Sequence, residues 1–290
     1  MFLRKKFRLR LPSRTLVVGE RTLVMGVLNV TPDSFSDGRQ FLDAGAAVRH
    51  ALALERAGAD ILDIGGESTR PGSRGISARE ELARVLPVLA RLRGRLSIPI
   101  SIDTQKAEVA AAAIAAGAEI INDVSGLRSD PHLGKVAHRY GVPMVLMHMR
   151  GTPRTMQHGP FARDVVRDVT RGLRQALARA RSAGLAKKQV ILDPGIGFGK
   201  SFAQNFELLA RLPELASLGC PLLVGPSRKT FIGAALAPPG HPPLRPADRV
   251  WGTSATVVVA ILGGAHIVRV HDVAQMAQVA RVADAVLSAH

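Results

Sequence analysis

The chain repeats one phrase three times: AGADILDIGG at residues 57–66, AGAEIINDVSG at 116–126 and GGAHIVRVHDV at 263–273. In each copy a glycine suited to ending a helix is followed by an alanine and then by a short apolar run. Repetition of this kind indicates one unit, a helix followed by a strand, that the fold uses several times.

Short runs rich in Val, Ile and Leu recur along the whole chain, each followed by a polar or glycine-rich turn and an Ala-rich stretch of helix length. Their hydrophobicity is continuous rather than alternating, which is typical of parallel strands buried on both faces. Eight such runs in 290 residues, with no linker-like composition between them, predict an α/β protein built as a single (β/α)8 TIM barrel over residues 1–290. An open doubly wound sheet is the alternative. The runs are residues 23–28, 60–64, 98–102, 120–124, 144–149, 190–192, 221–224 and 267–270.

The segment before the first run, residues 1–22, has a different pattern. Residues 7–11 alternate between apolar and basic side chains and lead toward a turn at Gly19-Glu20. We therefore expect a small N-terminal β-hairpin with its turn at these two residues.

The net charge of +16 is concentrated in two segments, with +6 in residues 1–21 and +8 in residues 150–188. A groove that binds nucleic acid interleaves its basic residues with aromatic side chains that stack on bases. The chain has one Trp and one Tyr, and neither lies in these segments. We interpret both segments as solvated faces and expect no nucleic-acid partner, although a nucleic-acid binder that relies on charge alone stays open.

Cysteine content and hydropathy bound the cellular setting. The single cysteine, Cys220, excludes an internal disulfide and a multi-cysteine metal centre, so we expect a reducing compartment. The most apolar stretch, residues 255–270, is shorter than the ~18 residues of a membrane span and is interrupted by His266 and Arg269. We expect a cytoplasmic protein that makes no contact with a membrane.

Polar side chains gather where the predicted strands end, which is where TIM barrels carry their chemistry. Because alternate residues of a strand face the same way, Arg269 and His271 share one face, and Asp103 shares a face with Ser101. Carboxylates, an amide, an arginine and a histidine at one barrel mouth are costly to bury without a ligand or mutual pairing. The polar strand-end residues are Asn29, Asp63, Glu67, Asp103, Asn122, Asp123, His148, Asp193, Arg228, Lys229, Arg269, His271 and Asp272.

DPGIGFGKS at residues 193–201 has the look of a phosphate-binding loop but fails that test. A P-loop needs glycine at the position of Pro194, whose ring removes a donor and cannot adopt positive φ. The glycines that remain allow a ligand to approach the backbone, and Phe198 could stack on a planar ring. A tight turn that packs against a helix is the equally good alternative.

Three further loops contain groups that bind anions or cations. GPSRKT at 225–230 places two cations at a strand end, although two solvated cations are as common there. NVTPDSFSDG at 29–38 and ESTRPGS at 67–73 are rich in turn residues, and Arg70 and Asn29 within them could bind an anion and Mg2+ respectively. Each loop taken alone is more often a simple connection than a site.

Eight motifs, taken in order, resemble the dihydropteroate synthase family. They are MGVLNVTPDSFSDG, DIGGESTRPGS, SIDTQKAEV, INDVSG, LMHMRGTPRTMQ, LDPGIGFGK, SRKTFIG and RVHDV, and they extend from residue 25 to residue 273. The resemblance implies a TIM-barrel transferase of folate biosynthesis, a cytoplasmic homodimer and a target of sulfonamides. It implies condensation of 6-hydroxymethyl-7,8-dihydropterin diphosphate with 4-aminobenzoate to 7,8-dihydropteroate and pyrophosphate, with Mg2+ as cofactor.

The resemblance also implies roles for individual residues. Those expected to bind the pterin are Asp103, Asn122, Met147, Asp193, Phe198 and Lys229. Those expected to bind the diphosphate are Asn29, Thr69, Arg70, Arg269 and His271, with Asn29 as a Mg2+ ligand that Asp37 could assist. Those expected to bind 4-aminobenzoate are Phe35, Thr69, Pro71 and Thr230. The catalytic set that follows is Asp103, Asp193, Lys229, Arg269 and His271.

The chemistry of the substrates fits these residue types. Asp and Asn side chains can match the donors and acceptors of an amino-pyrimidinone edge, and Arg, His and Mg2+ can spread the charge of a departing diphosphate. We expect a dissociative reaction, in which diphosphate leaves first and the arylamine then attacks a methylene cation that Asp103 and Asp193 stabilise. Two other hypotheses stay open: that the chain is a pterin-binding methyltransferase domain of corrinoid enzymes, or that it is a non-catalytic pterin-binding paralogue.

Overall fold

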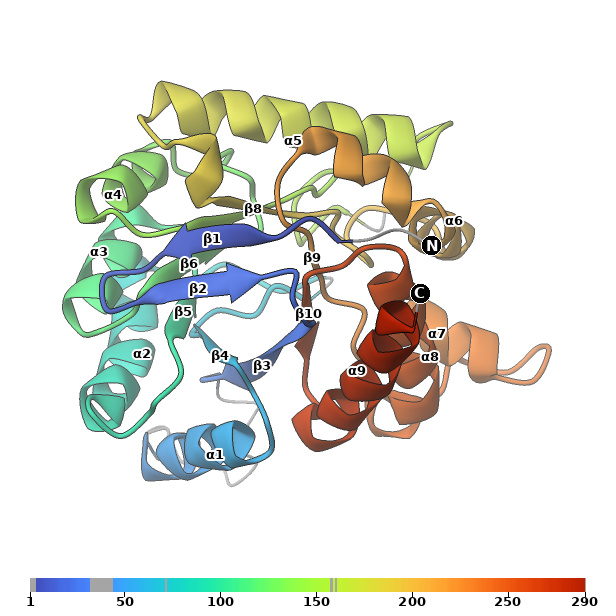
Figure 1. Ribbon diagram of the computed structural model, residues 1–290, viewed down its shortest axis with the longest axis horizontal. Coiled ribbons are helices and arrows are strands. Elements are labelled where there is room, and N and C mark those ends of the chain that lie inside the picture. The colour runs from blue at the N-terminus through green and yellow to red at the C-terminus, as the bar shows by residue number, and fades with distance from the viewer. Residues whose placement is uncertain (1–3, 32–43, 71, 157–158, 160, 290) are drawn as a thin grey trace.

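Eight parallel strands form a barrel with helices around it, as the apolar runs predict (Figure 1). The computed structural model describes residues 4–31, 44–70, 72–156, 159 and 161–289. The strands are β3 (Leu23–Asn29), β4 (Ile61–Gly65), β5 (Ile100–Asp103), β6 (Ile120–Asp123), β7 (Met144–Met147), β8 (Val190–Asp193), β9 (Leu223–Val224) and β10 (Ile267–Val270). They pair in the order β8-β7-β6-β5-β4-β3-β10-β9, and a parallel bridge between Leu192 and Leu222 joins the two ends. This closure excludes the open doubly wound alternative.

Helices follow the strands and cover the outside of the barrel. They are α1 (Ala44–Arg56), α2 (Ala78–Leu92), α3 (Ala107–Ala115), α4 (His132–Tyr140), α5 (Val165–Ser182), α6 (Phe202–Ala210), α7 (Thr230–Leu236), α8 (Val250–Leu262) and α9 (Val273–Ser288), with short 3-10 turns η2 (Lys187–Gln189), η3 (Leu212–Leu218) and η4 (Pro246–Arg249). No helix in the described ranges is long and apolar enough to cross a bilayer.

Alternation along each strand divides the barrel into two apolar cores. Side chains such as Leu62, Ile102 and Leu146 face outward and pack under the helices. Side chains of the other parity face the lumen, where Met25, Ile120, Val145, Ile191, Leu223 and Ile267 form a separate buried cluster. These residues fill the part of the lumen where the strands begin. The polar residues two positions further along the strands therefore stand at the opposite end, the mouth at which the strands end.

The N-terminal hairpin lies against the end of the barrel at which the strands begin (Figure 1). Its strands, β1 (Phe7–Arg10) and β2 (Thr15–Val18), are antiparallel, and Leu9, Leu11 and Val18 are buried in the same cluster as the lumen residues. The hairpin therefore caps the end of the barrel opposite the strand-end motifs.

The predicted position of the hairpin turn is wrong. Because Arg10 pairs with Thr15, the turn occupies residues 11–14, where the Leu11 N–H donates to the Arg14 carbonyl at 2.8 Å and Pro12 supplies a fixed φ. Gly19 comes after β2, at φ +103°, and packs where a Cβ would lie 2.5 Å from the Lys5 carbonyl oxygen. Residue 19 must therefore be a glycine because of this close approach to Lys5, and not because of a hairpin turn.

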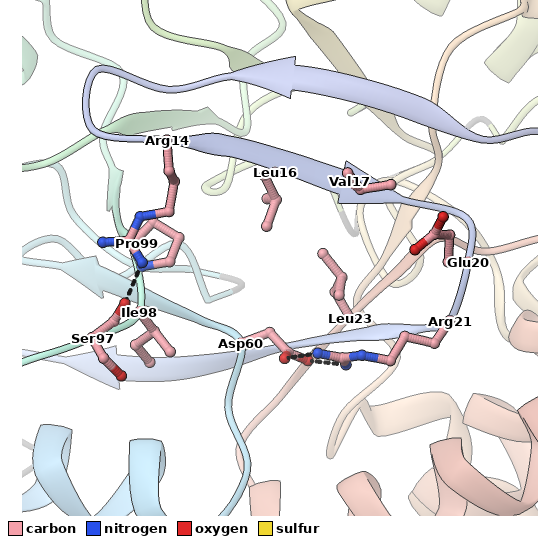
Figure 2. A pocket seen from close by; sticks show the side chains of 10 residues that line it. All are labelled: Arg14, Leu16, Val17, Glu20, Arg21, Leu23, Asp60, Ser97, Ile98 and Pro99. Atoms are coloured by element: carbon pink, nitrogen blue, oxygen red, sulfur yellow. Dashed lines mark hydrogen bonds and ion pairs between the residues drawn. The ribbon is translucent and has the colours of Figure 1, made fainter.

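A hollow of about 460 Å3 lies between the hairpin and the barrel (Figure 2). Its charged side chains are occupied, because Arg21 forms a two-pronged ion pair with Asp60 and Arg14 donates to the Ser97 carbonyl. Asp60 also accepts from the Val24 N–H at 2.9 Å. These contacts fasten the hairpin turn to the segment before β5, and the residues after the hairpin to the start of β4.

Helix α5 has the two faces that its sequence predicts. Arg167, Arg171 and Arg174 are exposed, whereas Val169 and Leu173 are buried. The 3-10 turn η2 that follows α5 lies against β1, so the two basic segments of the sequence adjoin in space.

Candidate active site

A cavity of about 500 Å3 lies at the carboxyl ends of the strands. This volume is within the ~300–1,000 Å3 range of ordinary small-molecule sites. The predicted site residues that line it are Asn29, Thr69, Arg70, Asp103, Phe198, Lys229, Thr230, Arg269 and His271. The strand ends therefore bring together residues that are up to 242 positions apart in the chain.

Arg269 is the centre of a buried hydrogen-bonded cluster at this mouth. Its Nε donates to Asp63 Oδ2 at 2.6 Å and its Nη2 donates to Asp103 Oδ2 at 2.7 Å. Asn122 Nδ2 donates to the same Asp63 oxygen at 3.0 Å. Asp63 is completely buried, and its other oxygen, Oδ1, has no partner among the described residues. An acceptor held in this way is available to a donor on a bound ligand.

Asp63 is the site residue that the sequence reasoning left without a role. Its signal is the repeated phrase itself, because Asp63, Asn122 and Arg269 each stand two residues after an isoleucine at the same position of the three copies. All three therefore face the lumen at one level, and they bond to one another there.

Two aspartates of the site are held away from water. Burial, together with the Asp63 carboxylate, raises the pKa of Asp103 to about 7, although Arg269 opposes that rise. Burial also raises the pKa of Asp193 to about 6, against a hydrogen bond of 2.7 Å that its Oδ1 accepts from the Gly195 N–H. Both carboxyls are poised to change their protonation state when a ligand brings donors or charge.

Lys229 and Phe198 form one wall. The Lys229 ammonium lies 4.0 Å from the centroid of the Phe198 ring, a cation–π arrangement. Burial, with the charge of Arg269, lowers the pKa of Lys229 to about 8. Gly197 has φ +83°, and a Cβ there would lie 2.9 Å from Lys229 Cδ, so the glycine makes room for the lysine.

Met147 lies in an apolar cluster with Phe198. Both side chains are at least 90% buried, together with Val124, Met149 and Met156. The cluster offers flat, polarisable surface beside the polar groups of the mouth, which suits a planar ring.

His271 and Asn29 are further polar groups that line the cavity. The Ser227 hydroxyl lies 3.1 Å from both the His271 backbone N–H, from which it accepts, and His271 Nδ1, to which it can donate. The ring proton is on Nε2 when the hydroxyl donates to Nδ1, and on Nδ1 when the hydroxyl accepts from it. Burial and the neighbouring Arg269 lower the pKa of His271 to about 3, so the imidazole is a neutral donor.

The two adjacent cations of GPSRKT have different fates. Both line the cavity, but Arg228 forms a two-pronged pair with Asp272, with Nε donating at 2.9 Å, whereas Lys229 lies over the Phe198 ring. Arg228 adopts φ +58°, an uncommon conformation for a residue with a side chain, and Arg249 supports it by donating to its carbonyl at 2.7 Å.

A divalent cation would find few protein ligands here. The described residues contain no group of three or more His, Cys, Asp and Glu side chains that could hold a metal. Asn29 supplies one amide oxygen to the cavity. Such a donor set fits Mg2+, which commonly takes one or two protein oxygens and completes its octahedron with water and substrate phosphates.

Part of the predicted 4-aminobenzoate site cannot be placed. Thr69 and Thr230 line the cavity. Phe35 and Pro71, and Asp37 beside the predicted metal site, lie outside the described residues.

Comparisons with known proteins agree with one another. A family model described as pterin binding enzyme matches residues 25–271. A dihydropteroate synthase from Synechocystis sp. is 51% identical over 267 residues, which cover 92% of this chain and 91% of that protein. The Xanthomonas albilineans dihydropteroate synthase with 4-aminobenzoic acid superposes with a TM-score of 0.89 at 46% identity, covering 98% of this chain and 99% of the other. The Yersinia pestis dihydropteroate synthase in a sulfonamide drug complex gives 0.90 at 43% identity, covering 98% and 100%.

Proposed function

The chain belongs to the dihydropteroate synthases, which join 6-hydroxymethyl-7,8-dihydropterin diphosphate to 4-aminobenzoate in folate biosynthesis, and we propose how its own residues perform that reaction. The observation that carries the proposal is the Arg269 cluster, because it joins two carboxylates and an amide to one cation at the barrel mouth, where Asp103 and Arg269 line the cavity. Those groups match an amino-pyrimidinone ring at one end and an anion at the other.

The pterin edge would be recognised by Asp103, Asn122, Asp193 and Lys229. The carboxylates accept from the ring N–H and amino groups, and the Asn122 amide and the Lys229 ammonium can donate to ring acceptors. Donors that approach Asp103 and Asp193 favour the ionised forms, which burial disfavours in the free protein. Met147 and Phe198 would cover the ring faces, because they form the apolar wall beside these groups.

The diphosphate would lie toward Asn29, Thr69, Arg70, Arg269 and His271. Arg269 uses Nε and Nη2 for the aspartates, and within the described residues its Nη1 has no hydrogen bond, so this nitrogen is left for an anion. His271 can donate from Nε2. Mg2+, held by Asn29 and by diphosphate oxygens, would add charge that makes the diphosphate a better leaving group.

The reaction breaks the bond between the pterin methylene carbon and the diphosphate oxygen and forms a bond from that carbon to the arylamine nitrogen. We propose that the first bond breaks before the second forms. Arg269, Arg70 and His271 stabilise the negative charge that leaves, and the carboxylates of Asp103 and Asp193 stabilise the positive charge left on the pterin methylene. The arylamine then attacks, and pyrophosphate and one amine proton are released.

The 4-aminobenzoate ring would occupy the part of the cavity beside Thr69 and Thr230. Phe35 and Pro71 remain predictions for the same site. Sulfonamides, one of which is present in the Yersinia pestis structure, would compete for this position. A cytoplasmic location also remains a prediction.

A homodimer is the assembly that we propose. Helices α8 and α9 expose Trp251, Val259, Val282 and Val286, with relative exposures of 79%, 44%, 67% and 48%. Large apolar side chains on neighbouring helices are typical of a self-complementary interface. Light scattering on the wild type and on Trp251→Asp tests this, with a dimer expected for the first and monomer for the second.

Pyrophosphate release tests the function. Purified protein supplied with the pterin diphosphate, Mg2+ and 4-aminobenzoate should release pyrophosphate and form dihydropteroate. Arg269→Ala should abolish this release while Arg91→Ala, an exposed change on α2, should not. Absence of release by the wild type, or unaltered release by Arg269→Ala, would contradict the proposal.

A further inference from the structure

Lys200, at the end of the DPGIGFGKS loop, is a buried lysine to which the reaction above gives no role. The residue is 2% exposed. Its ammonium donates to the carbonyls of Gly195 at 2.8 Å and Phe198 at 3.0 Å, and it lies 3.2 Å from His148 Nδ1. Each of the three ammonium protons therefore has an acceptor.

The third of these contacts defines the state of His148. While Lys200 is an ammonium, Nδ1 can only accept from it, so the proton of the neutral ring is then on Nε2. Burial lowers the pKa of Lys200 to about 7, so the ammonium form predominates below that pH. His148 Nε2 lies 3.6 Å from Asp168 Oδ2 on α5. Burial and the Lys200 charge lower the pKa of His148 to about 4, so the ring is neutral near pH 7. The result is a chain of polar contacts from the Asp168 carboxylate through His148 to Lys200.

The neighbourhood is built around this chain. A Cβ on Gly172 of α5 would lie 2.4 Å from His148 Cδ2, so only glycine leaves room for the ring. Gly195 has φ +69°, and a Cβ there would lie 1.9 Å from the His148 carbonyl oxygen. The loop thus rests directly on the residue that follows β7, and Lys200 fixes it there from the other side.

The carbonyls to which Lys200 donates belong to Gly195 and Phe198, which contact residues expected to bind the pterin. Phe198 supports the Lys229 ammonium at 4.0 Å, and the Gly195 N–H donates to Asp193 Oδ1 at 2.7 Å. Displacement of the loop would therefore move both the ring and the carboxylate. A misplacement of about 1 Å in such groups is enough to cost a large factor in binding or rate.

We propose that Lys200, oriented by His148 and Asp168, is a positioning residue that fixes Asp193 and Phe198 for the pterin ring. This inference rests on the proposed function of the cavity. It assigns the contribution of Lys200 to one substrate, because Asp193 and Phe198 are both expected to bind the pterin and neither is among the residues expected to bind 4-aminobenzoate.

The test compares Lys200→Met, which keeps the length of the side chain and removes its donors, with Lys188→Met, an exposed control on η2. Calorimetry gives the Kd of the pterin diphosphate with Mg2+, and steady-state kinetics gives the KM of each substrate. Lys200→Met should raise the Kd and the KM for the pterin diphosphate by about tenfold or more. It should leave the KM for 4-aminobenzoate within about twofold, and Lys188→Met should change neither.

Equal changes in the two KM values, or an unchanged pterin Kd in Lys200→Met, would overturn the inference. If that variant does not fold, Asp168→Asn decides, with Glu207→Gln on α6 as the matched control because each carboxylate pairs with an arginine three or four residues further along the chain. A pterin Kd raised at least about threefold in Asp168→Asn alone supports the positioning chain, and a smaller change overturns it. A wild type that binds no pterin diphosphate would instead contradict the proposed function.

Discussion

Replacement of Arg269 by methionine should destabilise the protein by an amount that grows with pH. The change removes two charge-assisted hydrogen bonds, to Asp63 and Asp103, which are 0% and 7% exposed. Loss of one partner from a buried ion pair costs about 3–5 kcal/mol when the other charge must stay ionised. The carboxyl groups can avoid that cost by taking up protons.

The direction of the pH effect follows from Asp103. Its pKa is about 7 in the fold because of burial, even though Arg269 lowers it, and the unfolded chain ionises near the ordinary value of 3.8. A carboxyl whose pKa is raised by folding makes the free energy of unfolding fall as pH rises between those two values. Without Arg269 the folded pKa rises further, so the fall continues above pH 7 in the variant after it has ended in the wild type.

Differential scanning calorimetry at pH 5 and pH 8 measures this difference. At pH 8 the loss of about 3 kcal/mol corresponds to a Tm lower by about 6 °C in a chain of this size. At pH 5 the loss should be smaller by about 1 kcal/mol, because the extra fall above pH 7 amounts to at most about 1.4 kcal/mol per pH unit. Arg269→Lys, which keeps the charge but not the fork, should fall between the wild type and Arg269→Met at pH 8. An equal Tm loss at both pH values, or a larger one at pH 5, would refute the reasoning.

Four further predictions test separate parts of the structure. Asp193→Asn keeps an acceptor for the Gly195 N–H but should weaken pterin binding about 10- to 100-fold by calorimetry. It should raise the Tm at pH 8, because a buried carboxylate is removed, and a lower Tm there would contradict the raised pKa of about 6. Wild-type affinity for the pterin should likewise fall about tenfold per pH unit between pH 7 and pH 6, where Asp103 takes up a proton, and more steeply below pH 6, where Asp193 does so too; a flat profile would exclude this. Gly172→Ala should lower the free energy of unfolding, measured in urea, by about 1–3 kcal/mol, because the new Cβ would lie 2.4 Å from His148 Cδ2. This loss should outweigh the better helix propensity of alanine, and a stabilised variant would show that the His148 ring moves aside at little cost. Asn29→Ala should raise the Mg2+ concentration for half-maximal activity about tenfold, and an unchanged Mg2+ titration would remove Asn29 from the metal site.

Much of the barrel is predictable because its strands are apolar on both faces. Each of the eight predicted runs contains an observed strand or overlaps one, with ends that differ by a few residues, as at 98–102 against β5 (Ile100–Asp103). The hairpin was predictable from alternation, but its turn was not. Gly19 carries the sequence signal of a turn, whereas burial of Leu9 and Val18 against the lumen and the pairing of Arg10 with Thr15 place the turn at residues 11–14.

The site was predictable in composition and less so in its connections. Motif order identified Asp103, Asn122 and Arg269, yet it gave Asp63 no role and assigned Arg269 to the diphosphate alone. In the structure Asp63 accepts from both Asn122 and Arg269, and Arg269 also bonds to Asp103. No rule of local sequence relates groups that are 59 and 206 positions apart.

The sequence by itself therefore determined which residue types stand at the strand ends, because hydrophobic period and turn residues act over a few positions. The tertiary structure alone decided which of those side chains share hydrogen bonds. That depends on the order β5-β4-β3-β10, which brings distant strands side by side, and on the lumen-facing parity that sets Asp63, Asn122 and Arg269 at one level. Closure of the barrel is thus what turns three copies of a repeated phrase into one binding site.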